Sequence, residues 1–268
     1  MAAIKVGVVG CAGRMGRMNL AAIAASDSCE VAAASEHPDS KWIGHDLGAL
    51  IGEGPFGITV ESNLDAVFAK SDVVIDFTLP APSMQHVAAA VRHRTALVLG
   101  TTGLSADQQA EVETAAASAP ILQAANMSLG VNLLIELVTQ AAAAMDPDYD
   151  IEVLEMHHRH KVDAPSGTAL ALGQAAAAGR AVDLEAVSQR VRDGHTGERR
   201  RGDIGFATLR GGDVAGEHSV IFAGAGERIE LTHRATSREV FVRGAVRAAT
   251  WLAGRPAGLY SMKDVLGL

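Results

Sequence analysis

The chain has 268 residues, of which 48% are hydrophobic and 20% are charged, and its formal net charge is −8. This length and composition fit one large or two modest globular domains with real cores and exclude a disordered chain. The negative charge argues against a general binder of nucleic-acid backbone, because such proteins depend on a basic surface.

The cysteines and the longest uncharged run bear on where the protein works. Cys11 and Cys29 form neither a disulfide framework nor a zinc-ribbon spacing, which fits a reducing compartment. Only five residues separate Lys5 from Cys11, too few for the apolar region of a signal peptide. Polar residues, Pro and Gly interrupt the uncharged run at 114–135, which makes it a poor membrane span. We therefore expect a soluble, cytoplasmic protein that binds neither membranes nor nucleic acid.

The first third of the chain alternates short apolar runs with helix-like segments. The apolar runs, typical of strands buried on both faces, are residues 4–10, 29–35, 71–78, 95–100 and 120–126. The stretch after the first run, 14–26, has the composition of a helix. This alternation predicts an α/β fold with a Rossmann-type, doubly wound parallel sheet.

Three glycines, Gly10, Gly13 and Gly16, lie where the first strand should meet the first helix. Glycine there permits a tight turn, a close approach of the backbone to a pyrophosphate and packing of the helix on the strand. Ala12 occupies the middle-glycine position of the common pattern, so the match is to GxxGxxG. Glu36, at the end of the second strand, can accept hydrogen bonds from an adenine-ribose diol. The pattern predicts a dinucleotide site; the alternative is a structural glycine turn followed by a surface glutamate.

Beyond residue 127 the pattern becomes that of an α+β domain. Segments 131–145 and 166–179 read as helices and 150–158 as a strand, while 203–237 shows short β-rich runs divided by glycine turns, typical of antiparallel hairpins. The last helical segment, 238–254, could return to cover the first sheet. We predict a dinucleotide-binding domain of residues 1–127 and 238–268, and a substrate-binding and oligomerisation domain of residues 128–237 with a mostly antiparallel open sheet.

A cationic cluster precedes the predicted helix at 166–179. Its stretch EMHHRHKVDAPSGTAL carries His158 and Lys161 and then a rigid turn that leads into Ser166-Gly167-Thr168. Backbone N–H groups at a helix start, together with charged donors, form a receptor for a carboxylate. A solvated polar loop would account for any one of these residues but not for their combination.

Two other chemistries fit the same stretch less well. A metal site is disfavoured because, on a strand, His158 and His160 would point away from His157, and Arg159 and Lys161 would repel a cation. A nucleophilic serine is disfavoured because PSGTA lacks the G-x-S-x-G pattern of a strand-elbow-helix turn.

The stretch EMHHRHKVDAPSGTALALG resembles the signature of the dihydrodipicolinate reductase (4-hydroxy-tetrahydrodipicolinate reductase) family of the diaminopimelate route to lysine. The likeness continues through GCAGRMGR, DFT, GTTG, AANMSLGVN, GHTGER, IGFATLRGGDVAGEH and GAVRAATWL. It implies an enzyme that reduces a cyclic imine with two carboxylates, 4-hydroxy-tetrahydrodipicolinate, to tetrahydrodipicolinate with hydride from NADH or NADPH. It further implies no metal and a homotetramer joined through the sheet of the second domain.

The resemblance also implies roles for residues. His157 and Lys161 match the catalytic positions, and either could donate the proton. The implied substrate-binding residues are His158, Lys161, Ser166, Gly167 and Thr168. The implied cofactor-binding residues are Gly10, Cys11, Ala12, Gly13, Arg14, Met15, Glu36, His37, Gly100, Thr101, Thr102, Ala124, Ala125, Asn126 and Met127. Members that use NADPH well commonly carry Arg where this chain has His37; since Arg clasps a 2′-phosphate and neutral His does not, we predict a preference for NADH.

Two alternatives remain open from the sequence. A dehydrogenase that oxidises a semialdehyde through a thiol would need a catalytic cysteine, yet Cys11 lies in the glycine loop and Cys29 before the second strand. A non-catalytic nucleotide sensor would keep the glycine loop and Glu36 but would not need His157 and Lys161 beside an anion pocket.

Overall fold

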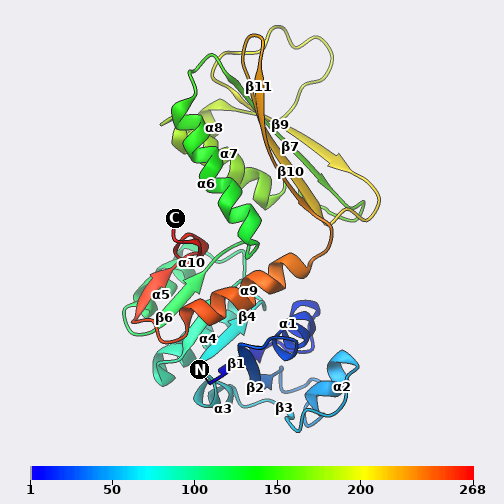
Figure 1. Cartoon of the computed structure of the whole chain (residues 1–268), viewed down its shortest axis with the longest axis vertical. Coiled ribbons are helices and arrows are strands. Elements are labelled where there is room, and N and C mark those ends of the chain that lie inside the picture. Colours follow the sequence, from blue (N-terminus) through cyan, green and yellow to red (C-terminus); the bar gives the residue numbers. More distant parts are fainter. Residues whose placement is uncertain (1) are drawn as a thin grey trace. The chain divides into compact units, whose positions relative to one another are not determined.

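The computed structural model describes residues 2–268 (Figure 1). The chain forms two compact units, one of residues up to 129 together with 239–268, the other of residues 130–238. Among residues 2–268, no helix has the length and apolar character needed to cross a membrane.

The first unit is built on a seven-stranded sheet in the order β12-β6-β5-β4-β1-β2-β3. Every neighbouring pair in it is parallel. The strands are β1 (Ile4–Val9), β2 (Cys29–Ser35), β3 (Val60–Glu61), β4 (Val73–Asp76), β5 (Ala96–Leu99), β6 (Pro120–Gln123) and β12 (Gly258–Tyr260). The five predicted strands are present, and β3 and β12 at the two edges are too short to show a sequence pattern.

Helices cover both faces of this sheet, as the strand composition requires. They are α1 (Arg14–Ala24), α2 (Leu47–Ile51), α3 (Leu64–Lys70), α4 (Pro80–His93), α5 (Ala106–Ala116), α9 (Glu239–Leu252) and α10 (Met262–Leu266). Successive strand residues point to opposite faces: Val98 packs in the cluster formed with α1, α9 and α10, while Leu97 and Leu99 pack in the cluster formed with α3, α4 and α5. The predicted return of the last long helix to the first sheet is confirmed, and α9 lies beside α1 (Figure 1).

The second unit holds a five-stranded sheet in the order β11-β10-β7-β9-β8. Its elements are α6 (Leu129–Ala144), β7 (Asp150–His157), α7 (Gly167–Gly179), α8 (Leu184–Val187), β8 (Ser188–Gln189), β9 (Ile204–Arg210), β10 (Gly216–Ala223) and β11 (Arg228–Ala235). The predicted fold class, a Rossmann-type parallel sheet and a second α+β sheet, is confirmed.

One detail of the hairpin prediction is wrong. β10 and β11 form an antiparallel hairpin, but β9 and β10 are not neighbours, because β7 lies between them. β7 is antiparallel to β10 and parallel to β9. The glycines between β9 and β10 permit a turn of either kind, so they do not reveal that β7 lies between the two strands.

One face of the second sheet changes from apolar to polar along its strands. On β7, Ile151 and Val153 pack with residues of α6 and α7, and the next two residues on the same face are Glu155 and His157, which are also buried. On β10, His218 lies on the same buried face as Val220. The polar part of this face holds the second unit's candidate site.

Candidate active site

The glycine loop between β1 and α1 is shaped as a cradle. Gly10 has a φ of +63°, which favours glycine, and a Cβ at Gly16 would lie 2.2 Å from the Gly10 carbonyl oxygen. The loop is thus closed onto the start of α1, whose first residue, Arg14, is exposed. This geometry fits a pyrophosphate at the helix N-terminus.

Glu36, at the end of β2, lies against the glycine loop. Its Oε1 accepts a hydrogen bond of 2.9 Å from the Ala12 N–H, and its Oε2 accepts one of 3.0 Å from the His37 N–H. His37 is exposed and its Nδ1 lies 3.5 Å from an Asp39 carboxylate oxygen. The Glu36 carboxylate keeps lone pairs for a ribose diol. The charged side chains next to His37 are the carboxylates of Glu36 and Asp39.

The other predicted cofactor residues follow the carboxyl ends of β5 and β6. Thr101 is buried and Thr102 is exposed at the end of β5, and Ala125 is exposed at the end of β6. Met127 is buried, and a Cβ at Gly244 of α9 would lie 1.7 Å from its carbonyl oxygen, so α9 passes close to this loop. All predicted cofactor residues therefore lie at one edge of the sheet, where ligands bind in open α/β folds.

Cys11 is fully buried in this cradle. Burial, with the nearby charge of Glu36, raises the pKa of its thiol to about 12. Because the thiolate is the reactive form, this residue does not act as a nucleophile near neutral pH. The geometry therefore disfavours a thiol-dependent dehydrogenase.

In the second unit, the carboxylate of Glu155 joins three elements. Its Oε2 accepts from His157 Nδ1 at 2.5 Å and from an Arg210 guanidinium nitrogen at 2.9 Å; its Oε1 accepts from Ser166 N at 2.9 Å and from Arg210 at 3.0 Å. Burial alone would raise the pKa of Glu155, but the hydrogen bonds from Arg210, His157 and Ser166 outweigh it and lower the pKa. Glu155 is therefore a buried carboxylate with donors from β7, β9 and the start of α7.

His157 has one ring nitrogen committed to that carboxylate. Since Nδ1 is bonded to Glu155, the other nitrogen, Nε2, is directed elsewhere, toward Gly216, whose absent Cβ would lie 3.1 Å from it. Burial lowers the pKa of His157, and the charges of Lys161 and Arg210 add to this against the opposing effect of Glu155. The ring is thus neutral near pH 7 with its Nε2 unprotonated.

His218 lies beside His157, with ring centroids 5.0 Å apart. Its Nε2 is 3.2 Å from the Ser166 hydroxyl, and burial lowers the pKa of His218 to about 4, with the His157 ring adding to the effect. Within residues 2–268 its buried Nδ1 has no hydrogen-bond partner. This nitrogen is suited to a polar ligand.

His158 presents a second such nitrogen. Its Nε2 lies 3.2 Å from an Arg238 guanidinium nitrogen, which can only donate. With Nε2 accepting from Arg238, Nδ1 carries the ring proton; this nitrogen is buried and has no partner in the described part of the chain. A buried N–H donor without a partner fits a carboxylate ligand.

The remaining predicted substrate residues lie around the start of α7. The Ser166 hydroxyl caps this helix by accepting from Ala169 N at 3.2 Å, and Gly167 is exposed at its first position. Lys161 Nζ forms an ion pair of 2.8 Å with Asp163. Ser166 and His157 are joined through Glu155, whereas the ion-pair partner of Lys161 is Asp163, so a ligand would have to displace or share that pair.

Three residues of this site, Glu155, Arg210 and His218, were not predicted from the sequence. Glu155 was detectable, because it lies two residues before His157 and so on the same face of a strand. Arg210 and His218 were not, because only the pairing of β7 with β9 and β10 brings them to Glu155.

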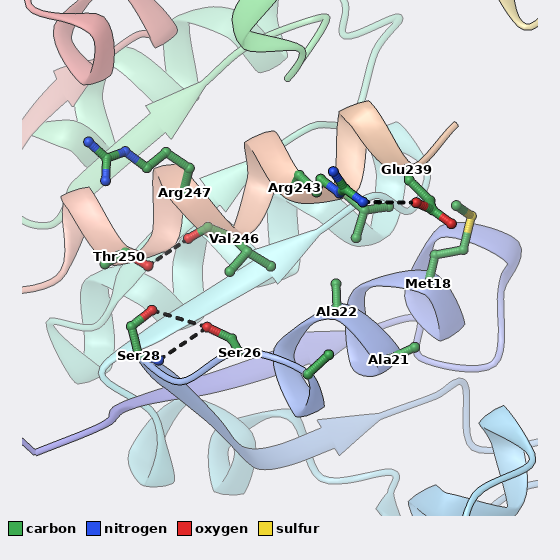
Figure 2. A pocket seen from close by; sticks show the side chains of 12 residues that line it. Met18, Ala21, Ala22, Ser26, Ser28, Glu239, Arg243, Val246, Arg247 and Thr250 are labelled. Carbon is green, nitrogen blue, oxygen red and sulfur yellow. Dashed lines mark hydrogen bonds and ion pairs between the residues drawn. The ribbon is translucent and has the colours of Figure 1, made fainter. Parts of the chain in front are cut away.

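Two further observations concern a possible metal site and a hollow in the first unit. Among residues 2–268, no cluster of three or more His, Cys, Asp or Glu side chains is arranged to hold a metal ion. A hollow of about 680 Å³ lies between α1 and α9 (Figure 2), lined by alanines of α1 and by Arg243 and Arg247 of α9. It contains none of the predicted site residues.

A parallel doubly wound sheet with a glycine cradle after β1 and an acidic residue after β2 defines the class of nicotinamide-dependent oxidoreductases. Comparison with known families narrows this class. Residues 4–127 match the family model "Dihydrodipicolinate reductase, N-terminus" and residues 130–266 match "Dihydrodipicolinate reductase, C-terminus". The chain belongs to the dihydrodipicolinate reductase family, as its motifs predict.

Curated relatives and a solved structure agree with this assignment. The 4-hydroxy-tetrahydrodipicolinate reductase of Afipia carboxidovorans is 56% identical over 268 residues, covering 100% of this chain and 98% of the relative. That of Roseobacter denitrificans is 52% identical, covering 99% and 97%. A dipicolinate-bound dihydrodipicolinate reductase from Paenisporosarcina sp. TG-14 superposes with a TM-score of 0.78 at 25% identity, covering 98% of this chain and 99% of that one.

Proposed function

We propose that the chain reduces 4-hydroxy-tetrahydrodipicolinate to tetrahydrodipicolinate with hydride from NADH, as a step of lysine and diaminopimelate biosynthesis in the cytoplasm. The observation that carries this proposal is the Glu155–His157 pair beside the start of α7, in a chain of this family. The first unit is then the dinucleotide-binding domain, and the second binds the substrate.

The substrate has two carboxylates, and the second unit offers donors for them. His158 Nδ1 is a buried N–H without a protein partner in the described residues, and the exposed first position of α7, Gly167, lies at the positive end of the helix. The related structure that contains dipicolinate, itself a dicarboxylate, supports a receptor of this kind. Lys161 adds a cation beside the imine nitrogen, where it stabilises the reacting group.

The proton that completes the reduction comes from Lys161 in this proposal. A neutral His157 with its Nδ1–H bonded to Glu155 has no proton on Nε2 to give, whereas a lysine ammonium carries three. His157 Nε2 then orients the substrate by accepting a hydrogen bond, and Lys161 takes its proton back from solvent water between turnovers. The bound cofactor supplies only the hydride, and water leaves the substrate in the overall reaction.

The cofactor would be held by the glycine cradle, Glu36 and the loops after β5 and β6. Glu36 would accept from the ribose hydroxyls, but the same carboxylate repels a 2′-phosphate, and the next residue, His37, is near Asp39 rather than offering a fixed cation. This supports NADH over NADPH.

A homotetramer joined through the second sheet is the expected assembly. The face of β7 and β9 that points away from α6 and α7 carries Leu154, Met156 and Leu209, the last of them 48% exposed. An apolar sheet face of this kind is covered when it pairs with another subunit.

A coupled assay tests the activity. The imine is generated in situ from pyruvate and aspartate semialdehyde by the preceding synthase, and loss of reduced-nicotinamide absorbance is followed with NADH and NADPH separately. Oxidation that requires both this chain and the imine supports the proposal, and equal or better efficiency with NADPH refutes the cofactor preference. Tight NADH binding without turnover would instead favour the nucleotide sensor.

The Lys161→Ala variant tests the proton donor. We expect a loss of kcat of roughly 10²- to 10⁴-fold with NADH binding unchanged, because a general acid contributes about that much. Arg159→Ala is the matched control, since Arg159 is an exposed cation of the same turn. Equal activity of the two variants would count against Lys161.

A further inference from the structure

A buried polar cluster lies in the first sheet next to the carboxyl ends of β4 and β5, and of its members only Thr101 has been given a role so far. It consists of Asp76 at the end of β4, Thr78 just after it, Ser83 and His86 on α4, and Thr101 just after β5. The Asp76 and Ser83 side chains are fully buried, and His86 is 7% exposed. Polar groups so deeply buried are retained only where they bond one another.

The Asp76 carboxylate bonds the side chains of Thr78, His86 and Thr101, and Ser83 bonds the two threonine hydroxyls. Oδ1 accepts from Thr78 N at 2.8 Å, from the Thr78 hydroxyl at 2.7 Å and from the Thr101 hydroxyl at 3.3 Å. Oδ2 lies 2.7 Å from His86 Nδ1. Ser83 donates to the Thr101 hydroxyl at 2.8 Å and lies 3.3 Å from that of Thr78.

These bonds fix the loops that follow three neighbouring strands. Thr101 belongs to the loop after β5, and Gly100 N also donates to the Asp76 carbonyl at 2.8 Å. Thr78 lies in the loop after β4, and its Cγ2 would be 2.5 Å from a Cβ at Gly10, so its methyl group packs against the glycine cradle after β1. The cluster thus determines the relative positions of the loops after β1, β4 and β5.

We propose that Asp76 and His86 are positioning residues for the dinucleotide: through Thr78 and Thr101 they set the distance between the glycine cradle and the loop at Gly100. Neither residue needs to touch the cofactor. The proposal rests on the proposed function, because it presumes that these loops bind NADH.

The chemistry of the cluster explains why a carboxylate occupies this position. A carboxylate only accepts hydrogen bonds and offers about four acceptor sites, so it can collect donors from a backbone N–H, two hydroxyls and an imidazole. Burial alone would raise the pKa of Asp76, but His86 and the hydroxyls outweigh burial and lower it, which keeps the acceptor charged. A merely structural cluster would stabilise the fold without affecting the cofactor.

The test compares NADH affinity with thermal stability in the full chain. Ser83→Ala removes the bridge between Thr78 and Thr101, and Asp76→Asn removes the charge. His86→Leu removes the Oδ2 partner, and His86→Asn restores a donor at the place of Nδ1. Thr95→Val is the matched control, because the Thr95 hydroxyl is buried in the same unit next to β5 but at its amino end, where it donates to Phe68 O at 2.9 Å.

Dissociation constants are measured from the change in NADH fluorescence on binding, and Tm by calorimetry. We expect Ser83→Ala, Asp76→Asn and His86→Leu to weaken NADH binding roughly five- to tenfold, His86→Asn to recover most of the affinity, and Thr95→Val to lower Tm without changing affinity. If His86→Leu does not fold, Ser83→Ala and Asp76→Asn decide alone.

Unchanged affinity in the folded cluster variants, or a loss in Thr95→Val equal to theirs, overturns the positioning role while the reductase function stands. Failure of the unsubstituted chain to bind NADH or NADPH overturns both. The two failures are therefore distinguishable by one titration of the unsubstituted chain.

Discussion

Replacing Glu155 by Gln tests how the second unit controls its catalytic histidine. Both carboxylate oxygens of Glu155 face donors: His157 and Arg210 on Oε2, Ser166 N and Arg210 on Oε1. A Gln amide must therefore direct its NH₂ group at N–H donors in either orientation. The less costly orientation places NH₂ toward His157, because the imidazole can move its proton from Nδ1 to Nε2 and accept, whereas a backbone N–H cannot.

The size of the effect follows from these contacts. Glu155→Gln converts two charge-assisted bonds with Arg210 and one with His157 into neutral or unfavourable contacts, each worth about 1.5–3 kcal/mol. Relief of a buried charge offsets part of this loss, so we expect the free energy of unfolding to fall by about 2–4 kcal/mol. A histidine held in the wrong tautomer by a comparable Asp-to-Asn change loses about 10⁴-fold in kcat in serine proteases; here we expect roughly 10²- to 10⁴-fold.

The assay is steady-state reduction of the imine at saturating NADH, with unfolding followed in urea. Glu152→Gln is the matched control: Glu152 lies three residues earlier on β7, is paired with Arg192 and Arg199, and has no bond to His157. Both variants should lose stability, but only Glu155→Gln should lose turnover. A folded Glu155→Gln protein with kcat within a few-fold of the unsubstituted chain would refute the reasoning.

Three further outcomes are expected. Because the pKa of His218 is lowered from 6.5 to about 4 on folding, stability is complete above about pH 6.5 and falls by about 3 kcal/mol as the pH drops to about 4; His218→Gln should flatten that part of the curve of unfolding free energy against pH. Gly16→Ala should abolish NADH binding or folding, since its Cβ would lie 2.2 Å from Gly10 O, whereas Gly54→Ala, where the Cβ meets nothing within 4 Å, should do neither by fluorescence titration. His37→Arg should raise kcat/KM for NADPH about tenfold or more without abolishing NADH use; no gain in that ratio would show that residue 37 does not select the cofactor.

The parts of the fold that follow from local pattern could be predicted. The run at 29–35 coincides with β2 because its apolar small residues are buried on both sides, and the GxxGxxG stretch marks the turn into α1 because only glycine tolerates the approach of Gly16 to Gly10. The edge strands β3 and β12 have two and three residues, too few for any periodicity. Their existence depends on pairing with β2 and β6, which is tertiary information.

For the candidate site too, the residues that are close in sequence could be predicted, and those brought in by strand pairing could not. His157, His158 and Lys161 stand in one short stretch, so the sequence places them together. Arg210 reaches Glu155 across 55 residues, through the parallel pairing of β7 with β9, and His218 lies directly opposite Glu155 through the pairing of β7 with β10. The register of strands depends on the whole sheet and is not written in either segment alone.

Each unit uses a buried carboxylate in the same way. Asp76 ends β4 and accepts from the loops after β4 and β5 and from α4, while Glu155 lies near the end of β7 and accepts from β7 itself, from the start of α7 and from the end of β9. A single neutral acceptor could not receive so many donors, and a buried charge without them would be too costly to retain. Since the pKa of each carboxyl is lowered on folding, the stability each contributes is present above its ordinary value near 4 and is lost as the pH falls through the lowered one. The two carboxylates share no partner, so the losses in Asp76→Asn and Glu155→Gln should add in the double variant. The arrangement that orients each ligand-facing loop is therefore also the one that makes each unit sensitive to acid.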